Sequence, residues 1–199
     1  EDGRHGTLQG ALDGSWELLD LPCQQALAVL STFEGVASPA DAGVLLQAAD
    51  LEPDAVLAAL AAHSLLDASS DGVRLFRQVR AYARLQRDRL GLTPTSRQAH
   101  ADHFSRLGSP EAQRQLRGPD RRMALDEQRR CLPDLLVAQQ HAVQTGQGAL
   151  AGRLWMAALP PLEHSGQAAK AEATGAAVSA LLADGSPLAV QIDDERLRL

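Results

Sequence analysis

Apolar residues recur at three- and four-residue intervals along most of the chain, which is the pattern of amphipathic helices. In the first third, such stripes run through residues 8–19, 21–33, 38–48 and 52–63. The third stripe opens on Ser38-Pro39-Ala40-Asp41, which combines a capping serine with a proline at the first helical position. The fourth opens in a similar way on Glu52-Pro53-Asp54. The chain is therefore predicted to be helical up to His63.

The periodicity changes after His63. Two short apolar runs, 64–68 and 73–76, flank the polar stretch Ser69-Ser70-Asp71-Gly72. An Asp-Gly step between two short apolar runs is a hairpin signal. Helical spacing resumes at Val79 and continues to Leu90. Helices followed by a hairpin and a further helix are the element order of a winged helix, so we predict a winged-helix domain over residues 1–90.

The second half of the chain reads as helices separated by short breaks. Gly91-Leu92-Thr93-Pro94 interrupts the pattern, and we place a domain boundary there. Alanine-rich stripes in 149–162 and 169–181 would let antiparallel helices approach closely, as in solenoids of helical hairpins. Residues 91–199 are therefore predicted to form an α-helical solenoid-like segment, and the expected fold class is mostly α. Further breaks are expected at 108–110, 118–119, 132–133, 146–148, 164–166 and 185–187.

Several motifs resemble, in order, the region that follows the ATPase core of bacterial STAND-type signalling regulators. This family includes LuxR-type and SARP-type transcriptional regulators. The resemblance spans roughly residues 4–183. It is carried by Arg4–Leu19 (RHGTLQGALDGSWELL), Phe33–Gly35, Leu60–Leu66 (LAAHSLL), Val73–Ala83 (VRLFRQVRAYA), Gln98–Phe104 (QAHADHF) and Pro133–Gly146 (PDLLVAQQHAVQTG).

The resemblance implies a winged-helix module that packs on a nucleotide-binding core, followed by a linker into tetratricopeptide-like repeats. The chain contains no GxxxxGK[ST] motif and no Gly-Lys dipeptide, so it lacks the phosphate-binding loop of that core. Related switches carry a nucleotide-sensing histidine at the start of the helix after the wing, where this chain has Phe76. A phenyl ring cannot donate a hydrogen bond to phosphate, which leaves sensing to another group such as Arg77, or absent. We expect the chain, which begins without Met, to be a fragment or a processed product.

Charge is distributed unevenly. Residues 1–72 carry twelve acidic residues and only one basic residue, Arg4, whereas residues 73–90 carry six arginines and one aspartate. In a winged helix that reads DNA, the helix before the wing enters the major groove. Here that helix, 52–63, carries two acidic residues and no Lys or Arg, so phosphates would repel it and we do not expect direct DNA binding.

Four of the arginines, Arg77, Arg80, Arg84 and Arg87, are spaced to share one helix face, and they are the predicted interaction residues. Arginine can grip phosphate, but the acidic surroundings favour a contact with an acidic protein surface. That surface is either the nucleotide-binding core of a parent protein or the acidic half of this chain. A second basic cluster, Arg121, Arg122, Arg129 and Arg130, is mixed with acidic residues and is interpreted as a solvated helix.

No catalytic, cofactor-binding or metal-binding residue is predicted. His100 and His103 lie three residues apart, but two ligands are too few for a structural zinc site. Cys23 and Cys131 lie in helical patterns and are not predicted to be nucleophiles, and no serine stands in a Gly-x-Ser-x-Gly turn. With 3% aromatic residues, packing must rely on small apolar side chains. Trp16 and Trp155, which lie on apolar stripes, are expected to pack in the interior.

The sequence thus predicts a cytoplasmic, non-enzymatic regulatory module with protein partners, either the nucleotide-binding domain of a parent chain or effector and sensor domains. No apolar stretch is long enough to predict a membrane span or a signal peptide. One alternative is a stand-alone winged-helix transcriptional regulator that binds DNA. A catalytic helical domain is the third hypothesis.

Overall fold

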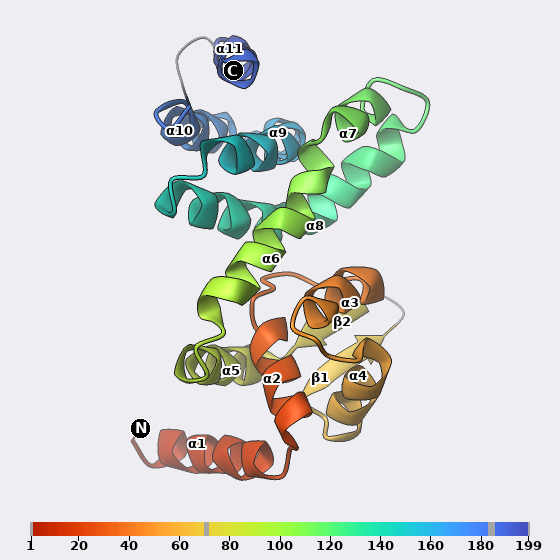
Figure 1. Cartoon of the computed structure of the whole chain (residues 1–199), viewed down its shortest axis with the longest axis vertical. Coiled ribbons are helices and arrows are strands. Elements are labelled where there is room, and N and C mark those ends of the chain that lie inside the picture. Colours follow the sequence, from red (N-terminus) through yellow and green to blue (C-terminus); the bar gives the residue numbers. More distant parts are fainter. Residues whose placement is uncertain (1, 70–71, 183–185, 199) are drawn as a thin grey trace. The chain divides into compact units, whose positions relative to one another are not determined.

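The computed structural model describes residues 2–69, 72–182 and 186–198, with side chains from Gln9 onward. The chain divides into two compact units, residues 1–96 (unit 1) and 97–199 (unit 2). The division lies a few residues beyond the predicted boundary and falls within helix α6 (Thr93–Ser105). The described residues are mostly helical with one small antiparallel sheet, which confirms the fold class at that level (Figure 1).

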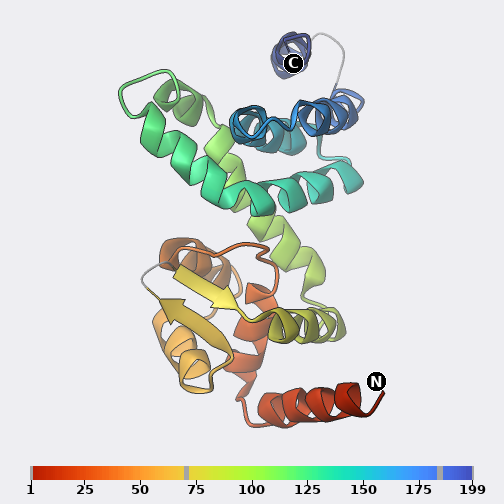
Figure 2. The same ribbon diagram turned by 180° about the vertical axis from the view of Figure 1, so that it is seen from behind.

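Unit 1 contains α1 (Asp2–Glu17), α2 (Leu21–Leu30), α3 (Pro39–Gln47), α4 (Pro53–Ala62), β1 (Leu66–Ser69), β2 (Gly72–Leu75) and α5 (Arg77–Arg89). The two strands pair antiparallel with Leu66 opposite Leu75, so the predicted hairpin is confirmed, while its turn residues 70–71 lie outside the described residues. Figure 2 shows β2 running directly into α5. A single β-bridge between Ala37 and Val73 joins the loop before α3 to the hairpin.

The predicted helix starts rest on local hydrogen bonds. The Ser38 side chain accepts from the Asp41 backbone N–H at 3.1 Å, and the Asp41 carboxylate accepts from the Ser38 N–H at 3.2 Å. This reciprocal capping box satisfies two backbone donors that a helix start leaves free. Asp20 caps α2 by accepting from the Cys23 N–H at 2.9 Å, and hydrogen bonds with the side chain and then the backbone of Cys23 lower the pKa of the Asp20 carboxyl. Such pairs fix where α2 and α3 begin.

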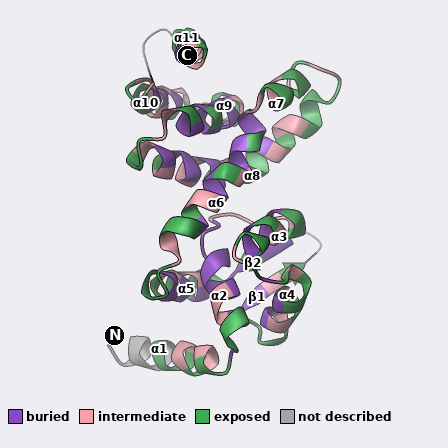
Figure 3. Ribbon diagram, in the orientation of Figure 1, coloured by how far each residue is buried: buried purple, intermediate pink, exposed green. Residues whose placement is uncertain are grey.

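Helix α2 forms the centre of unit 1. It packs against α3, α4 and α5, and six of its ten residues are buried. Aliphatic side chains from three helices meet there, including Leu27, Leu45 and Leu60, each at most 2% exposed. Figure 3 shows this buried surface concentrated on α2. The low aromatic content is thus compensated by closely packed leucine and alanine.

Unit 2 continues from α6 through a 3-10 turn (Arg106–Gly108), α7 (Pro110–Gln115), α8 (Arg121–Gln144), α9 (Gly148–His164), α10 (Ala168–Ser179) and α11 (Pro187–Arg196). Helix α9 packs against α8, α10 and α11 and is apolar over most of its surface. Trp155, in the middle of α9, is completely buried, as its apolar stripe predicted.

One predicted helix break is wrong. The break expected at 132–133 does not occur, because α8 continues without interruption from Arg121 to Gln144 and contains Pro133 in its interior. Proline removes one intrahelical hydrogen bond and normally ends or kinks a helix. Here the residues after it, including Leu135, Ala138 and Ala142, are buried where α8 packs along α9. That packing offsets the lost hydrogen bond.

Candidate functional site

The predicted arginine stripe lies on α5, and most of its side chains form hydrogen bonds with other residues of unit 1. Arg84 donates from Nε to the Ser31 carbonyl at 3.1 Å and from Nη2 to the Glu34 carboxylate at 2.5 Å. Arg80 donates to the Glu34 carbonyl at 2.5 Å. Arg87 is buried and donates to the Thr32 hydroxyl at 2.9 Å. Three of the four arginines therefore hold the segment that follows α2.

These contacts have an electrostatic cause. The segment that follows α2 presents the carbonyls of Ser31, Phe33 and Glu34 to the guanidinium groups, and the C-terminal end of a helix carries partial negative charge. Guanidinium groups supply both hydrogen-bond donors and positive charge at that point. Glu34, which lies three positions before the bridged residue Ala37, is the acidic residue that could have signalled this pairing in the sequence. Arg77 differs from the others: it is exposed, and no side-chain partner exists for it among the described residues.

Replacing Arg84 by alanine is expected to reduce the free energy of unfolding by about 1–2 kcal/mol, because it removes two charge-assisted hydrogen bonds from a half-buried site. The matched variant Arg77→Ala should change it by less than about 0.5 kcal/mol. Urea unfolding followed by far-UV circular dichroism measures both. Equal stabilities of the two variants would show that the contacts of Arg84 contribute nothing.

Helix α4, which precedes the hairpin, presents an acidic start and no basic residue. Glu52 is its N-cap residue and Asp54 lies in its first turn. Only Val56 and Leu60 of its ten residues are buried, and the others are partly or fully exposed. The surface of α4 can therefore offer a protein or solvent apolar side chains and two carboxylates, but no cation.

The histidine and cysteine side chains considered as candidates for chemistry make packing and hydrogen-bond contacts within the chain. His100 is 1% exposed, and its Nε2 lies 3.0 Å from an oxygen of Asp134, which is 2% exposed. His103 instead stacks edge-on against Phe104, with ring centroids 5.1 Å apart. No group of three or more metal-ligating side chains occurs in the part of the chain that the structure describes. Cys23 is buried, and burial raises the pKa of its thiol to about 11.

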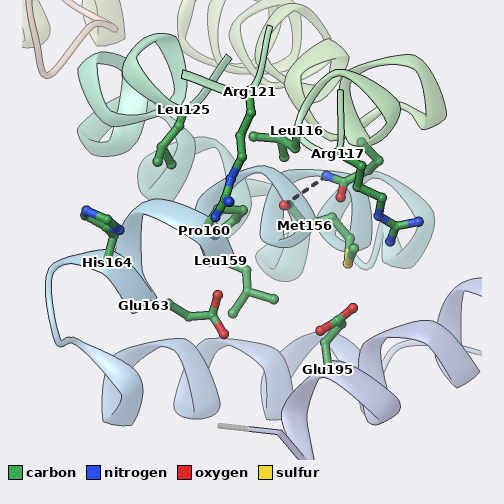
Figure 4. A pocket seen from close by; sticks show the side chains of 11 residues that line it. Leu116, Arg117, Arg121, Leu125, Met156, Leu159, Pro160, Glu163, His164 and Glu195 are labelled. Atoms are coloured by element: carbon green, nitrogen blue, oxygen red, sulfur yellow. Dashed lines mark hydrogen bonds between the residues drawn. The ribbon is translucent and has the colours of Figure 1, made fainter. Parts of the chain in front are cut away.

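A cleft of about 710 Å³ in unit 2 was not predicted (Figure 4). It is lined by residues from α7, the following loop, α8, α9 and α11. Its apolar lining includes Met156 and Leu159, each 4% exposed. Gln113 donates to the Met156 carbonyl at 3.2 Å, which ties α7 to α9 at this wall. The charged side chains that line it are Arg117, Arg121, Glu163 and Glu195, and His164 lies beside them.

The charges of the cleft lie on opposite sides. In Figure 4, Arg117 and Arg121 project from the side of α7 and α8, and Glu163 and Glu195 from the side of α9 and α11. Partial desolvation, and then the charge of Glu195, raise the pKa of the Glu163 carboxyl. Among the described residues, Arg117, Arg121 and Glu163 form no ion pair within 4.0 Å.

The basic cluster Arg121, Arg122, Arg129 and Arg130 behaves only in part as the solvated helix that its sequence predicts. Arg122 and Arg129 do approach Asp126 at the exposed surface, at 4.0 Å and 3.1 Å, as a mixed solvated helix would. Arg121 instead lines the cleft. The cleft is completed by residues of α9 and α11 that lie more than thirty positions away in sequence, so no local pattern could reveal the position of Arg121.

Comparison of the chain with protein-family models, with curated proteins and with solved structures finds no match in any of the three. Within the described residues, no helix has both the length and the apolar character that crossing a membrane requires. The functional argument therefore rests on the geometry and charges of the two units.

Proposed function

We propose that this chain is a non-catalytic regulatory module of the STAND type, in which unit 1 is a winged helix that docks on protein. Unit 2 would then serve as the helical adaptor that couples a nucleotide-binding core to a sensor region. The order of the motifs between residues 4 and 183 favours this family.

The arrangement of unit 1 supports the winged-helix interpretation. Three helices, α2 to α4, precede a hairpin, and α5 follows it. The bridge between Ala37 and Val73 attaches the segment before α3 to the hairpin, which gives the sheet a short third member. In this interpretation α4 stands in the place of the groove-reading helix and the β1–β2 hairpin is the wing.

The charge of α4 is the single observation on which we base the proposal of a protein partner instead of DNA. A helix that lies in the major groove is surrounded by phosphates, and binding is driven by counterions that Lys and Arg displace. Helix α4 has Glu52 and Asp54 at its start and no basic residue. The arginines of α5 cannot compensate fully, because Arg80, Arg84 and Arg87 already bind the segment after α2.

Exposed apolar side chains in unit 1 also favour a protein partner. Leu18 is 76% exposed, Leu85 is 55% exposed and Phe76 is 45% exposed. Phe76 is the N-cap residue of α5, at the position where the resembled family faces its nucleotide-binding core. A partner that covers large apolar residues removes them from water, which lowers the free energy of the complex.

The test is a salt titration of duplex DNA binding, by fluorescence anisotropy, with the wild-type chain and the variant Glu52→Arg/Asp54→Arg. The wild type is expected not to bind at about 0.1 M salt, because α4 repels phosphate. The reversed variant should gain salt-dependent binding if α4 occupies the groove-reading position. Steeply salt-dependent binding by the wild type would overturn the proposal and support the DNA-binding alternative.

A further inference from the structure

We propose that the cleft of unit 2 binds a peptide segment that carries one acidic and one basic side chain. The acidic group would lie against Arg117 and Arg121, and the basic group against Glu163 and Glu195. The inference goes beyond the proposed function, since it names a ligand class for a site in unit 2 and does not depend on how unit 1 is used.

The first step is that opposite charges face the same space without neutralising each other. Arg117 and Arg121 line one side of the cleft, and Glu163 and Glu195 line the other (Figure 4). No ion pair within 4.0 Å joins the two sides among the described residues. Among the described residues, Glu195 pairs with Arg198, which follows α11, at 3.3 Å, and the side chain of Arg198 is 68% exposed. A pair with such an exposed partner contributes little, and a ligand cation can replace the arginine.

The arginine side has a second feature that suits an anion. Arg121 is the first residue of α8, and the residue before it, Asp120, makes no side-chain capping hydrogen bond. The first N–H groups of α8 therefore lack a side-chain partner and add partial positive charge beside the guanidinium. A carboxylate placed there can accept from the Arg121 guanidinium, with the bidentate geometry that guanidinium groups favour.

Apolar side chains lie between the two charged sides of the cleft. Met156 and Leu159 are almost fully buried, and Leu116 and Leu125 are half-buried. A ligand that spans the cleft must therefore place an apolar group between its two charges. A peptide in which an acidic and a basic side chain are separated by aliphatic residues has this pattern.

The open rim favours a peptide over a small molecule. Pockets for small ligands usually cover most of the ligand surface. Here Arg117, Arg121 and Glu163 are all exposed, so a small molecule held between them would remain largely in water. A peptide segment can instead lie across the cleft, with its backbone outside and its side chains inside.

The experiment measures anisotropy of four fluorescein-labelled peptides with the full chain at low salt. The parent peptide is Gly-Glu-Leu-Leu-Lys-Gly, and the others replace its Glu, its Lys or both by Gln. The parent is expected to bind at least about fivefold more tightly than either singly charged peptide, because each loses one pair of contacts. The variant Arg117→Gln/Arg121→Gln should remove the preference for Glu and keep that for Lys. Glu163→Gln/Glu195→Gln should do the reverse.

Two exposed residues provide matched controls. The side chain of Arg122 is 96% exposed and that of Glu111 is 69% exposed, and neither lines the cleft. Arg122→Gln and Glu111→Gln should therefore leave all four affinities unchanged, and circular dichroism shows whether every variant is folded.

Equal binding of the four peptides, or variants that alter no preference, would overturn the inference. Binding of free 6-aminohexanoic acid in a calorimetric titration, with no binding of the parent peptide, would also overturn it, since the cleft would then be a small-molecule site. A failure of this kind leaves the DNA titration with α4 variants unaffected, so the two proposals fail separately.

Discussion

Replacing Trp155 by alanine is expected to lower the free energy of unfolding of unit 2 by about 3–5 kcal/mol. The indole is completely buried in the middle of α9, and its Nε1 donates to the Ala171 carbonyl at 2.9 Å. The substitution leaves a cavity and also removes the donor from a buried carbonyl. Trp155→Phe should recover part of the loss, because a phenyl ring fills much of the cavity but cannot donate.

The control for this prediction is Trp16→Ala. Trp16 is half-buried and meets Tyr82 edge-on, with ring centroids 5.9 Å apart. With part of its ring already in water, its removal should cost unit 1 about 1–2 kcal/mol. Urea unfolding by far-UV circular dichroism gives both values. Losses of equal size in the two variants would contradict the difference in burial.

The two tryptophans show what an apolar stripe can and cannot predict. Each lies at the helical spacing of its neighbours, so the sequence places both on inward faces. How deeply a face is buried depends on how many elements cover it. Helix α9 is covered by α8, α10 and α11, and Trp155 is fully buried. Trp16 lies near the end of α1 and meets the single ring of Tyr82.

Features encoded within a few residues were predictable. Ser38 and Asp41 cap a helix through bonds three residues apart, and the hairpin strands lie on either side of an Asp-Gly step. Features that depend on distant packing were not. Pro133 is tolerated because of the packing of α8 along α9, and the cleft combines residues from 113 to 195. The arginine stripe could be predicted only in part. The helical spacing of its residues is evident in the sequence, but their hydrogen-bond partners at residues 31–34 are not.

Gly108→Ala is expected to destabilise unit 2 by about 3 kcal/mol or more. The sequence marks Gly108 only as part of a break before Ser109-Pro110. In the structure it ends the 3-10 turn and lies directly against the backbone of α9. A Cβ atom there would overlap the carbonyl oxygen of Arg153 and lie 2.7 Å from its carbonyl carbon. Backbone cannot move aside as a flexible side chain can, so the turn and α9 must separate.

The matched control is Gly14→Ala on α1. A Cβ atom at Gly14 meets nothing within 4 Å, and the residue is exposed in a helix. Alanine should therefore stabilise unit 1 by about 0.5–1 kcal/mol through helix propensity alone. Thermal melting by circular dichroism should thus show opposite shifts for the two variants. A Gly108→Ala chain as stable as the wild type would mean that the turn does not approach α9 this closely. That result would also contradict the position of α7 beside the cleft.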